Sequence, residues 1–165
     1  MYKVKNSKVH GKGIYATQNI KKGVKIIEYL GEKISRKEGD RRSELRIKKY
    51  LNSKNIGSVY IFQLNAKQDI DGSPLYNKAR YINHSCDPNC EVDIENGKIW
   101  ISSLRRIKKG EELSYDYGYS FDKEDYKDHP CKCNSKNCIG YIISSDDWEK
   151  FIKHLKKQMK SLKKS

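Results

Sequence analysis

The stretch that decides the fold of this chain is Arg80-Tyr81-Ile82-Asn83-His84-Ser85-Cys86-Asp87-Pro88-Asn89-Cys90. Its apolar start ends in an Asn-His pair, which is followed by Ser-Cys and by an Asp-Pro turn signal. Within a few residues it offers hydrogen-bonding groups and a thiol that can bind a soft metal ion. The chain on either side decides what these groups do.

The 165 residues predict one domain that can bury a core without disulfides. The sequence has no apolar run of about 18 residues, which argues against a membrane span and a membrane partner. Residues 1–5 lack the apolar core of a secretory signal. We therefore expect an intracellular protein, in the cytoplasm, nucleoid or nucleus depending on the organism, or in a host cell if it is secreted.

The net charge of +14 favours polyanionic surroundings such as nucleic acid or nucleoprotein. Scattered lysines are also an ordinary solvated surface, so both interpretations stay open. Residues 111–128 depart from the basic background, because they hold seven acids against two bases, which is 2 − 7 = −5. This acidic run either attracts a basic peptide or balances nearby lysines.

Five cysteines is an odd number, which weakens the case for a disulfide framework. Cys131 and Cys133 are separated by one residue, and Cys138 follows five positions later. Together with Cys86 and Cys90, this spacing is typical of thiolate ligation in a reducing compartment.

Alternating apolar residues and glycines predict short strands and turns over residues 1–34. A short amphipathic helix is predicted from Ser43 in the basic insert 36–58, and Asp69–Pro74 has the composition of a turn. A second helix, with Ser145 as its N-cap, should present lysines on one face. Further strands are predicted at Val59–Leu64, Glu91–Ile94, Lys98–Ser102 and Glu112–Tyr117, with Asn96-Gly97 as a hairpin turn.

Four stretches together resemble the SET-domain protein lysine methyltransferases that carry a post-SET zinc segment. They are His10–Ala16, Tyr81–Asn89, Gly110–Tyr117 and the cysteines Cys131, Cys133 and Cys138. The resemblance implies a mainly β fold with short helices, built from small β-sheets, with a pseudoknot in which residues 80–90 and 112–117 cross. It divides the chain into a SET domain (2–120), a post-SET zinc-binding segment (121–142) and a basic C-terminal helix (143–165).

The resemblance also implies S-adenosylmethionine as cofactor, because this family binds it with the Gly-x-Gly turn and the Asn-His pair. The residues that correspond are Lys12, Gly13, Tyr15, Tyr81, Asn83 and His84. An amide such as that of Asn83 carries donors and an acceptor, which suits an amino-acid group with its own amine and carboxylate. For His84 we expect a backbone hydrogen bond to adenine rather than a role as a base.

Tyr117 is the predicted catalytic residue, and a core tyrosine without a catalytic role is the alternative. Attack of a neutral lysine amine on a sulfonium methyl group needs alignment and exclusion of water more than a strong base. The Tyr117 hydroxyl can position the amine or the methyl donor. In this family the position of Tyr115 helps to set how many methyl groups fit, and a tyrosine there resembles members that stop at mono- or dimethylation.

The cysteines fit the family's zinc site, in which Cys131, Cys133 and Cys138 are joined by the cysteine of the Asn-His-Ser-Cys run, here Cys86. Four thiolates form a closed tetrahedral Zn²⁺ site, which is structural rather than catalytic. Cys90 would then be a buried free thiol. A ligand set that uses Cys90 or His129 remains an alternative.

The sequence therefore predicts an S-adenosylmethionine-dependent protein-lysine N-methyltransferase. Its substrate would be a basic protein or peptide (histone-like, ribosomal or other), which makes chromatin one possible setting, and its basic surface could also bind nucleic acid or nucleoprotein. The alternative is a catalytically silent zinc-containing SET module that binds nucleic acid or nucleoprotein. The joint presence of Asn83, His84 and Tyr117 favours the enzyme.

Overall fold

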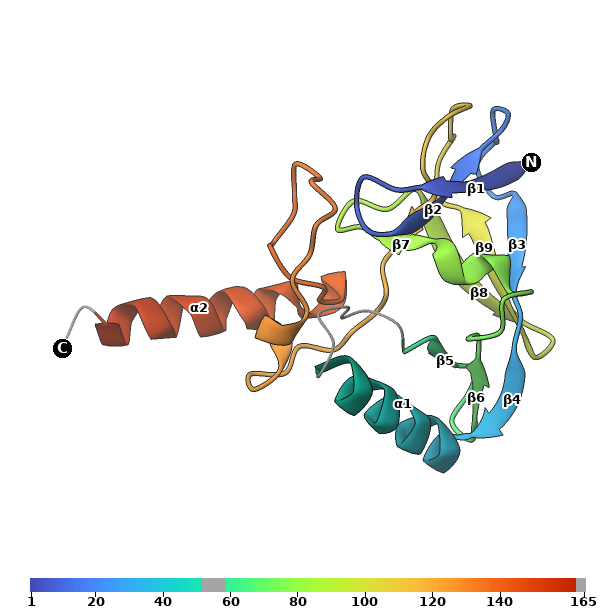
Figure 1. Cartoon of the computed structure of the whole chain (residues 1–165). Coiled ribbons are helices and arrows are strands. Elements are labelled where there is room, and N and C mark those ends of the chain that lie inside the picture. The colour runs from blue at the N-terminus through green and yellow to red at the C-terminus, as the bar shows by residue number, and fades with distance from the viewer. Residues whose placement is uncertain (52–58, 163–165) are drawn as a thin grey trace.

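Small β-sheets form the body of the protein in a computed structural model that describes residues 1–51 and 59–162 (Figure 1). Residues 52–58 of the predicted basic insert and residues 163–165 of the predicted C-terminal helix lie outside the described part. Within it, the strands are β1 (Tyr2–Asn6), β2 (Lys12–Ala16), β3 (Lys25–Tyr29), β4 (Glu32–Ser35), β5 (Ile61–Gln63), β6 (Gln68–Asp71), β7 (Asn83–His84), β8 (Cys90–Glu95), β9 (Lys98–Ser103) and β10 (Ser114–Tyr115).

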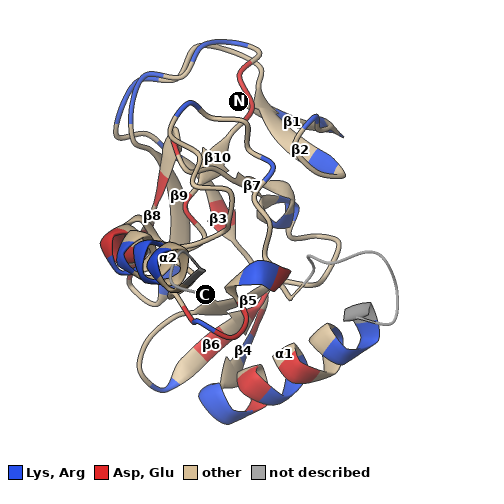
Figure 2. Cartoon of the chain, turned by 90° about the vertical axis from the view of Figure 1, so that its left-hand side faces the viewer, with Lys and Arg blue, Asp and Glu red and all other residues tan. Residues whose placement is uncertain are grey.

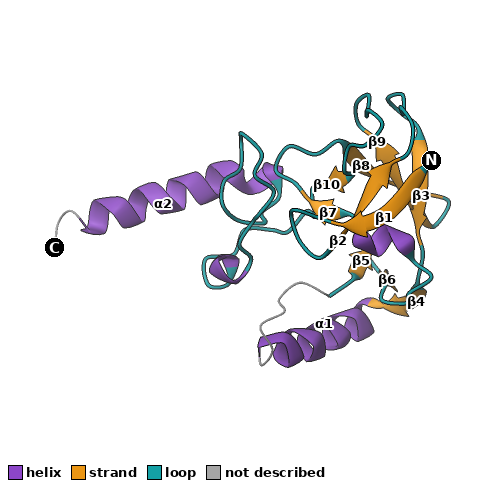
Figure 3. Cartoon of the chain, turned by 45° about the horizontal axis from the view of Figure 1, so that its top comes forward, coloured by secondary structure: helices purple, strands orange, loops and turns teal. Residues whose placement is uncertain are grey.

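Two longer helices complete the fold, α1 (Arg36–Leu51) and α2 (Trp148–Leu162). Three short 3-10 turns, η1 (Lys78–Tyr81), η2 (Tyr126–Asp128) and η3 (Ser145–Asp147), lie between them along the chain. Among residues 1–51 and 59–162, no helix is both long and apolar enough to span a membrane. These strands and helices confirm the predicted mainly β fold with short helices. Figure 3 shows the loop-rich segment that separates the sheets from α2.

The strands pair in four small sheets within the described residues: β1-β2, β3-β9-β8, β4-β6-β5 and β7-β10. The predicted hairpin between β8 and β9 is confirmed, with Asn96 and Gly97 at φ angles of 50° and 70°. Both positive angles belong to the tight turn whose twist matches two antiparallel strands. The core beneath these sheets is rich in isoleucine, with Ile14, Ile99, Ile101 and Ile107 fully buried.

Residues 80–90 meet residues 112–117, as the family resemblance implied. Here β7 and β10 pair in parallel, with Asn83 opposite Ser114 and His84 opposite Tyr115. The predicted strand Glu112–Tyr117 is too long, because its hydrogen bonds are divided among different partners. Glu112 bridges to Tyr15 of β2, and the Tyr117 N–H turns to the His84 side chain.

The predicted start of the first helix at Ser43 is wrong, since α1 begins at Arg36. Ser35 caps this helix by accepting a hydrogen bond from the Glu38 N–H at 3.2 Å, and a Ser-x-x-Glu spacing favours such a start. Gly39 obscured the helix in the sequence because glycine is a poor helix former. It is needed there because a Cβ would overlap the Asp69 carboxylate.

The predicted turn at Asp69–Pro74 is also wrong, because β6 (Gln68–Asp71) is the central strand of its sheet. Its acidic residues are buried against α1 rather than exposed in a loop. Asp69 pairs with Arg36 at 2.7 Å, and Asp71 pairs with Arg42 and Arg46 at 2.7 and 2.8 Å. These ion pairs dock α1, whereas its apolar residues Leu45 and Ile47 are exposed.

A second, smaller hydrophobic cluster forms where the segment after residue 120 packs on the start of α2. Tyr126, Ile143 and Phe151 are its buried members. The cap of this C-terminal helical segment is Ser144 rather than the predicted Ser145, because the Ser144 Oγ accepts the Asp146 N–H. Beyond this cluster α2 extends away from the body, and its Ile152 and Met159 are exposed (Figure 1).

Candidate active site

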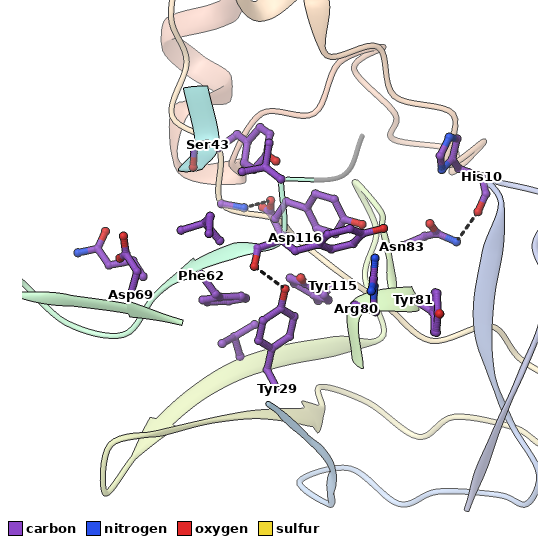
Figure 4. Close-up of a pocket in the computed structure, with 18 of the residues that line it drawn as sticks. His10, Tyr29, Ser43, Phe62, Asp69, Arg80, Tyr81, Asn83, Tyr115 and Asp116 are labelled. Carbon is purple, nitrogen blue, oxygen red and sulfur yellow. Dashed lines mark hydrogen bonds between the residues drawn. The ribbon is translucent and has the colours of Figure 1, made fainter. Parts of the chain in front are cut away.

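A cavity of about 650 Å³ lies between the β-sheet body, α1 and the segment that follows β10. Its volume is in the range of pockets that bind small-molecule ligands. Figure 4 shows aromatic side chains gathered around its centre. The aromatic residues that line it are Tyr29, Tyr60, Phe62, Tyr81, Tyr115, Tyr117 and Tyr119.

The two predicted catalytic tyrosines lie side by side in this cavity. The ring centroids of Tyr115 and Tyr117 are 5.0 Å apart, and the Tyr117 hydroxyl donates to the Ile82 carbonyl at 3.0 Å. Burial, together with neighbouring tyrosines, raises the pKa of the Tyr117 hydroxyl. The hydroxyl is therefore protonated at neutral pH, so it can orient a neighbouring group but cannot act as a base.

His84 connects Tyr117 to the cysteine cluster. Its Nδ1 accepts the Tyr117 N–H at 3.2 Å, while its Nε2 lies 3.6 Å from the Cys86 Sγ. Burial lowers the pKa of the imidazole, although Asp116 acts in the opposite direction. A neutral ring that accepts at Nδ1 carries its proton on Nε2. The ring is absent from the cavity lining and instead holds the backbone of Tyr117.

Asn83 is fixed by a network that has the Glu112 carboxylate at its centre. The Asn83 amide donates to Glu112 Oε1 at 2.8 Å and to the Lys12 carbonyl at 3.1 Å. The Ser7 and Tyr15 hydroxyls each donate to the same carboxylate at 2.7 Å. Gly13 makes room for this carboxylate, because a Cβ there would overlap it. The Gly-x-Gly turn is thus tied to Asn83 by the half-buried carboxylate of Glu112.

Two basic residues of the cavity, Lys12 and Arg80, lie near its tyrosines. The Arg80 guanidinium is 4.0 Å from the centroid of the Tyr60 ring, and Lys12 Nζ is 5.4 Å from that of Tyr81. Arg80 also donates to the Ser73 carbonyl. Its Nε is buried and has no hydrogen-bond partner in residues 1–51 and 59–162. A buried N–H group without an acceptor costs free energy, so the Arg80 Nε–H is available to donate a hydrogen bond to a ligand.

The four predicted metal ligands come together although 52 positions separate the first from the last. The Sγ atoms of Cys86, Cys131, Cys133 and Cys138 all lie within 4.8 Å of one another. Cys86 Sγ is 3.8 Å from Cys131 Sγ and 3.9 Å from Cys138 Sγ. A tetrahedral ZnS₄ centre with usual bond lengths has sulfur–sulfur edges of about 3.8 Å.

The surroundings of these thiols change their acidity in different directions. Burial raises the pKa of the Cys86 thiol to about 12. Although burial opposes them, hydrogen bonds lower the pKa of the Cys133 thiol to about 6. A divalent ion would stabilise the Cys86 thiolate, which burial otherwise disfavours. Cys90 and His129, the alternative ligands, are not members of this group. Cys90 is buried in the main core, where its thiol donates to Asn89 Oδ1 at 3.4 Å.

The cavity includes some of the predicted cofactor contacts and not others. Lys12, Tyr81 and Asn83 line it, together with Tyr115 and Tyr117. Gly13, Tyr15 and His84 do not line it, and their direct contact with a cofactor stays a prediction. Sequence reasoning missed Tyr60, Arg80 and Glu112. Only Glu112 carried a signal, because it directly precedes the Leu-Ser-Tyr-Asp-Tyr motif.

Replacing Glu112 with alanine should lower the free energy of unfolding by about 2–4 kcal/mol, because three hydrogen bonds to a partly buried carboxylate are lost together. Chemical denaturation followed by circular dichroism measures this change. Glu95→Ala is the control, since it removes only an exposed ion pair with Lys25, which contributes at most about 1 kcal/mol. Equal effects of the two substitutions would contradict a central structural role for Glu112.

Comparison with known proteins agrees with this arrangement. The family model for the SET domain matches residues 11–118. The chain is 43% identical over 140 residues to histone-lysine N-methyltransferase trithorax of Drosophila virilis, which covers 82% of this chain and 3% of that protein. It is 40% identical over 136 residues to histone-lysine N-methyltransferase 2D of Homo sapiens, covering 80% of this chain and 2% of that protein.

A third relative is the H3 lysine-4 specific histone-lysine N-methyltransferase of Saccharomyces cerevisiae, which is 39% identical over 140 residues, covering 82% of this chain and 12% of that protein. The chain therefore spans only a small part of the curated relatives it matches. The matched region contains the Gly-x-Gly turn, the Asn-His pair, Tyr115 and Tyr117. The chain belongs to the SET domain family.

Proposed function

We propose that the protein is an S-adenosylmethionine-dependent protein-lysine N-methyltransferase. The observation that carries this proposal is the paired tyrosines Tyr115 and Tyr117 in a cavity that Asn83 and Lys12 also line. Residues 2–120 would form the SET domain, residues 121–142 the zinc-binding segment and residues 143–165 the basic C-terminal helix. The names of the relatives, all histone-lysine N-methyltransferases, support the same reaction.

The cavity has groups that suit the amino-acid end and the sulfonium centre of the methyl donor. Lys12 and the Arg80 Nε can donate hydrogen bonds to its carboxylate. The oxygen of the Asn83 amide can accept a hydrogen bond from its amine. The aromatic rings around the cavity can contact the sulfonium cation through their faces. When bound, S-adenosylmethionine supplies a methyl group that is activated by the positive charge on sulfur.

The protein's own task is to present a neutral lysine amine in line with that methyl group. Lysine has a pKa of about 10.4 in water, and an apolar channel near a cation lowers it, so the proton can leave to solvent before the attack. The Tyr117 hydroxyl, held by the Ile82 carbonyl, would align the amine or the methyl donor. The rings of Tyr29, Tyr115 and Phe62 exclude water from this position.

We further propose that Cys86, Cys131, Cys133 and Cys138 bind one structural Zn²⁺. The tetrahedral spacing of their sulfur atoms supports this assignment. The ion would hold the residues after 120 against Cys86, because these residues pack in only a small hydrophobic cluster of their own. Since Cys86 lies two positions from His84, the metal site also supports the backbone of Tyr117.

The proposed substrate is a lysine in a basic protein or peptide, with histone-like and ribosomal proteins as the first candidates. The acidic run 111–128, with seven acids against two bases, would attract a basic segment. The basic surface would favour a substrate that is bound to nucleic acid. The alternative, a catalytically silent module that binds nucleic acid, predicts binding without methyl transfer.

One experiment separates these alternatives. The protein is incubated with radiolabelled S-adenosylmethionine and a panel of basic proteins that includes core histones and ribosomal proteins. Labelling of at least one protein on lysine, mapped by mass spectrometry, is the expected result. Absence of transfer to every member of the panel, by a protein that still binds nucleic acid, would favour the silent module.

Tyr115→Phe should raise the number of methyl groups that each target lysine receives. The Tyr115 hydroxyl is almost completely buried beside Tyr117, where it can hold a water molecule that occupies space needed by a further methyl group. We therefore propose that the wild-type enzyme stops at mono- or dimethylation. Mass spectrometry of the product peptide measures the distribution, and an unchanged distribution would reject this role for Tyr115.

A further inference from the structure

The sequence Ile-Lys-Lys-Gly occurs twice, at residues 20–23 and 107–110, and the fold brings the two copies together. The Ile20 N–H donates to the Ile107 carbonyl at 2.8 Å, and the Ile107 N–H donates back to the Ile20 carbonyl at 2.9 Å. Both isoleucines are buried, and each copy ends in a glycine with a positive φ angle, 77° and 90°. We call residues 20–23 and 107–110 the lysine turn pair.

Further hydrogen bonds fix the backbone of the lysine turn pair. The Lys109 N–H donates to Asn19 Oδ1 at 2.9 Å, and the Ser103 hydroxyl donates to the Lys21 carbonyl at 2.6 Å. The turns are therefore anchored to β9 and to each other. A rigid backbone lowers the entropy lost when the lysines bind a partner.

Most of the positive charges on this surface have no acidic partner among the described residues. Residues 17–23 and 104–110 together contain six basic residues and no acid. Arg105 pairs with Glu111 at 3.0 Å. The other five are exposed and form no ion pair with any residue in the described part of the chain: Lys21, Lys22, Arg106, Lys108 and Lys109. By contrast, Arg36, Arg42 and Arg46 of α1 are all paired.

The lysine turn pair lies apart from the cavity. None of its residues lines the cavity. In Figure 1 the loop before β3 and the loop after β9 lie side by side at the top, and α1 lies at the bottom. Figure 2 shows the basic residues of these loops at the end of the molecule away from α1. A partner bound here would leave the cavity open to a protein substrate.

We propose that the lysine turn pair binds the phosphate backbone of duplex DNA. Exposed lysines act as point charges, which suit phosphates and carry no base-sequence information. Proteins that bind single strands interleave basic residues with aromatic rings that stack on the bases. Residues 17–23 and 104–110 contain no aromatic residue. The surface therefore fits a paired helix, whose bases are already stacked, better than a single strand.

The test measures binding of the whole protein to a fluorescent duplex of about 20 base pairs by anisotropy, at several salt concentrations. The variant K21Q/K22Q/K108Q/K109Q removes the four lysines of the turn pair. We expect its affinity to fall about tenfold or more, and its slope of log K against log salt to flatten by about 2–4. K21Q/K22Q and K108Q/K109Q should each produce about half of the change in slope.

The control variant K153Q/K156Q/K157Q/K160Q removes the same charge from exposed positions on α2. We expect its affinity to change by no more than about threefold, because screening limits the effect of distant charges. Weak or absent duplex binding by the wild type at low salt, an equal loss in the α2 variant, or tighter binding of a matched single strand would each overturn the proposal. The assay contains no methyl donor, so its outcome is independent of the proposed catalytic function.

Discussion

Tyr117→Phe is expected to reduce kcat for methyl transfer about 100-fold or more, the usual effect of deleting one oriented polar group at a reacting centre. The substitution removes a single oxygen atom. The ring contacts with Tyr115 at 5.0 Å, His84 at 5.4 Å and Tyr119 at 6.0 Å would remain. Because the pKa of this hydroxyl is raised by burial, the loss would reflect alignment rather than removal of a base.

Single-turnover transfer to a labelled peptide measures this effect, and isothermal titration measures affinity for S-adenosylmethionine. We expect the affinity to change by less than about threefold, since alignment in the transition state is what the hydroxyl provides. Tyr126→Phe is the control, because Tyr126 is a buried tyrosine that belongs to the second hydrophobic cluster and not to the cavity. Wild-type kcat in Tyr117→Phe would show that Tyr117 is a structural residue only.

Removal of the metal is expected to abolish activity and to unfold the segment after residue 120. Only Tyr126, Ile143 and Phe151 are buried in the cluster of that segment, so its hydrophobic stabilisation is small. Structural zinc contributes about 10–16 kcal/mol of apparent binding energy in small zinc-dependent peptides. Loss of the ion would also release Cys86, whose neighbour His84 holds the Tyr117 backbone.

Cys86→Ser tests this expectation without a chelator. Metal analysis should find one zinc per wild-type chain and less than about a tenth of that in the variant, with activity lost in parallel. Hydrogen exchange should show faster exchange over residues 121–143 while β3, β8 and β9 stay protected. The matched control is Cys90→Ser, because Cys90 is buried but is not in the cluster. Equal loss of metal in both variants would contradict the ligand set.

The sequence was most informative where a short motif requires one local chemistry. The hairpin at Asn96-Gly97 followed from two residues that tolerate positive φ. The cysteine cluster and the meeting of residues 80–90 with 112–117 came from the family resemblance, which carries long-range information that spacing alone lacks. The same resemblance named Tyr115 and Tyr117, and both line the cavity.

Predictions from the sequence failed where burial reverses the usual structural preference of a residue type. Asp69 and Asp71 look like turn residues, yet arginines of α1 neutralise them inside a central strand. Gly39 looks like a helix breaker, yet its missing side chain lets α1 approach Asp69. In both cases the deciding partner is about 30 positions away, so no local window contains it.

The sequence by itself determined the family and the mainly β character, because these depend on residue type and short motifs, and the family resemblance named the four cysteines and the two tyrosines, Tyr115 and Tyr117. Only the tertiary structure decided that Glu112 ties the Gly-x-Gly turn to Asn83, and that His84 joins Tyr117 to Cys86. It alone brought the two Ile-Lys-Lys-Gly turns into contact across 87 positions. Each of these depends on distances between segments remote in sequence, which are fixed when the core and the strand pairings form.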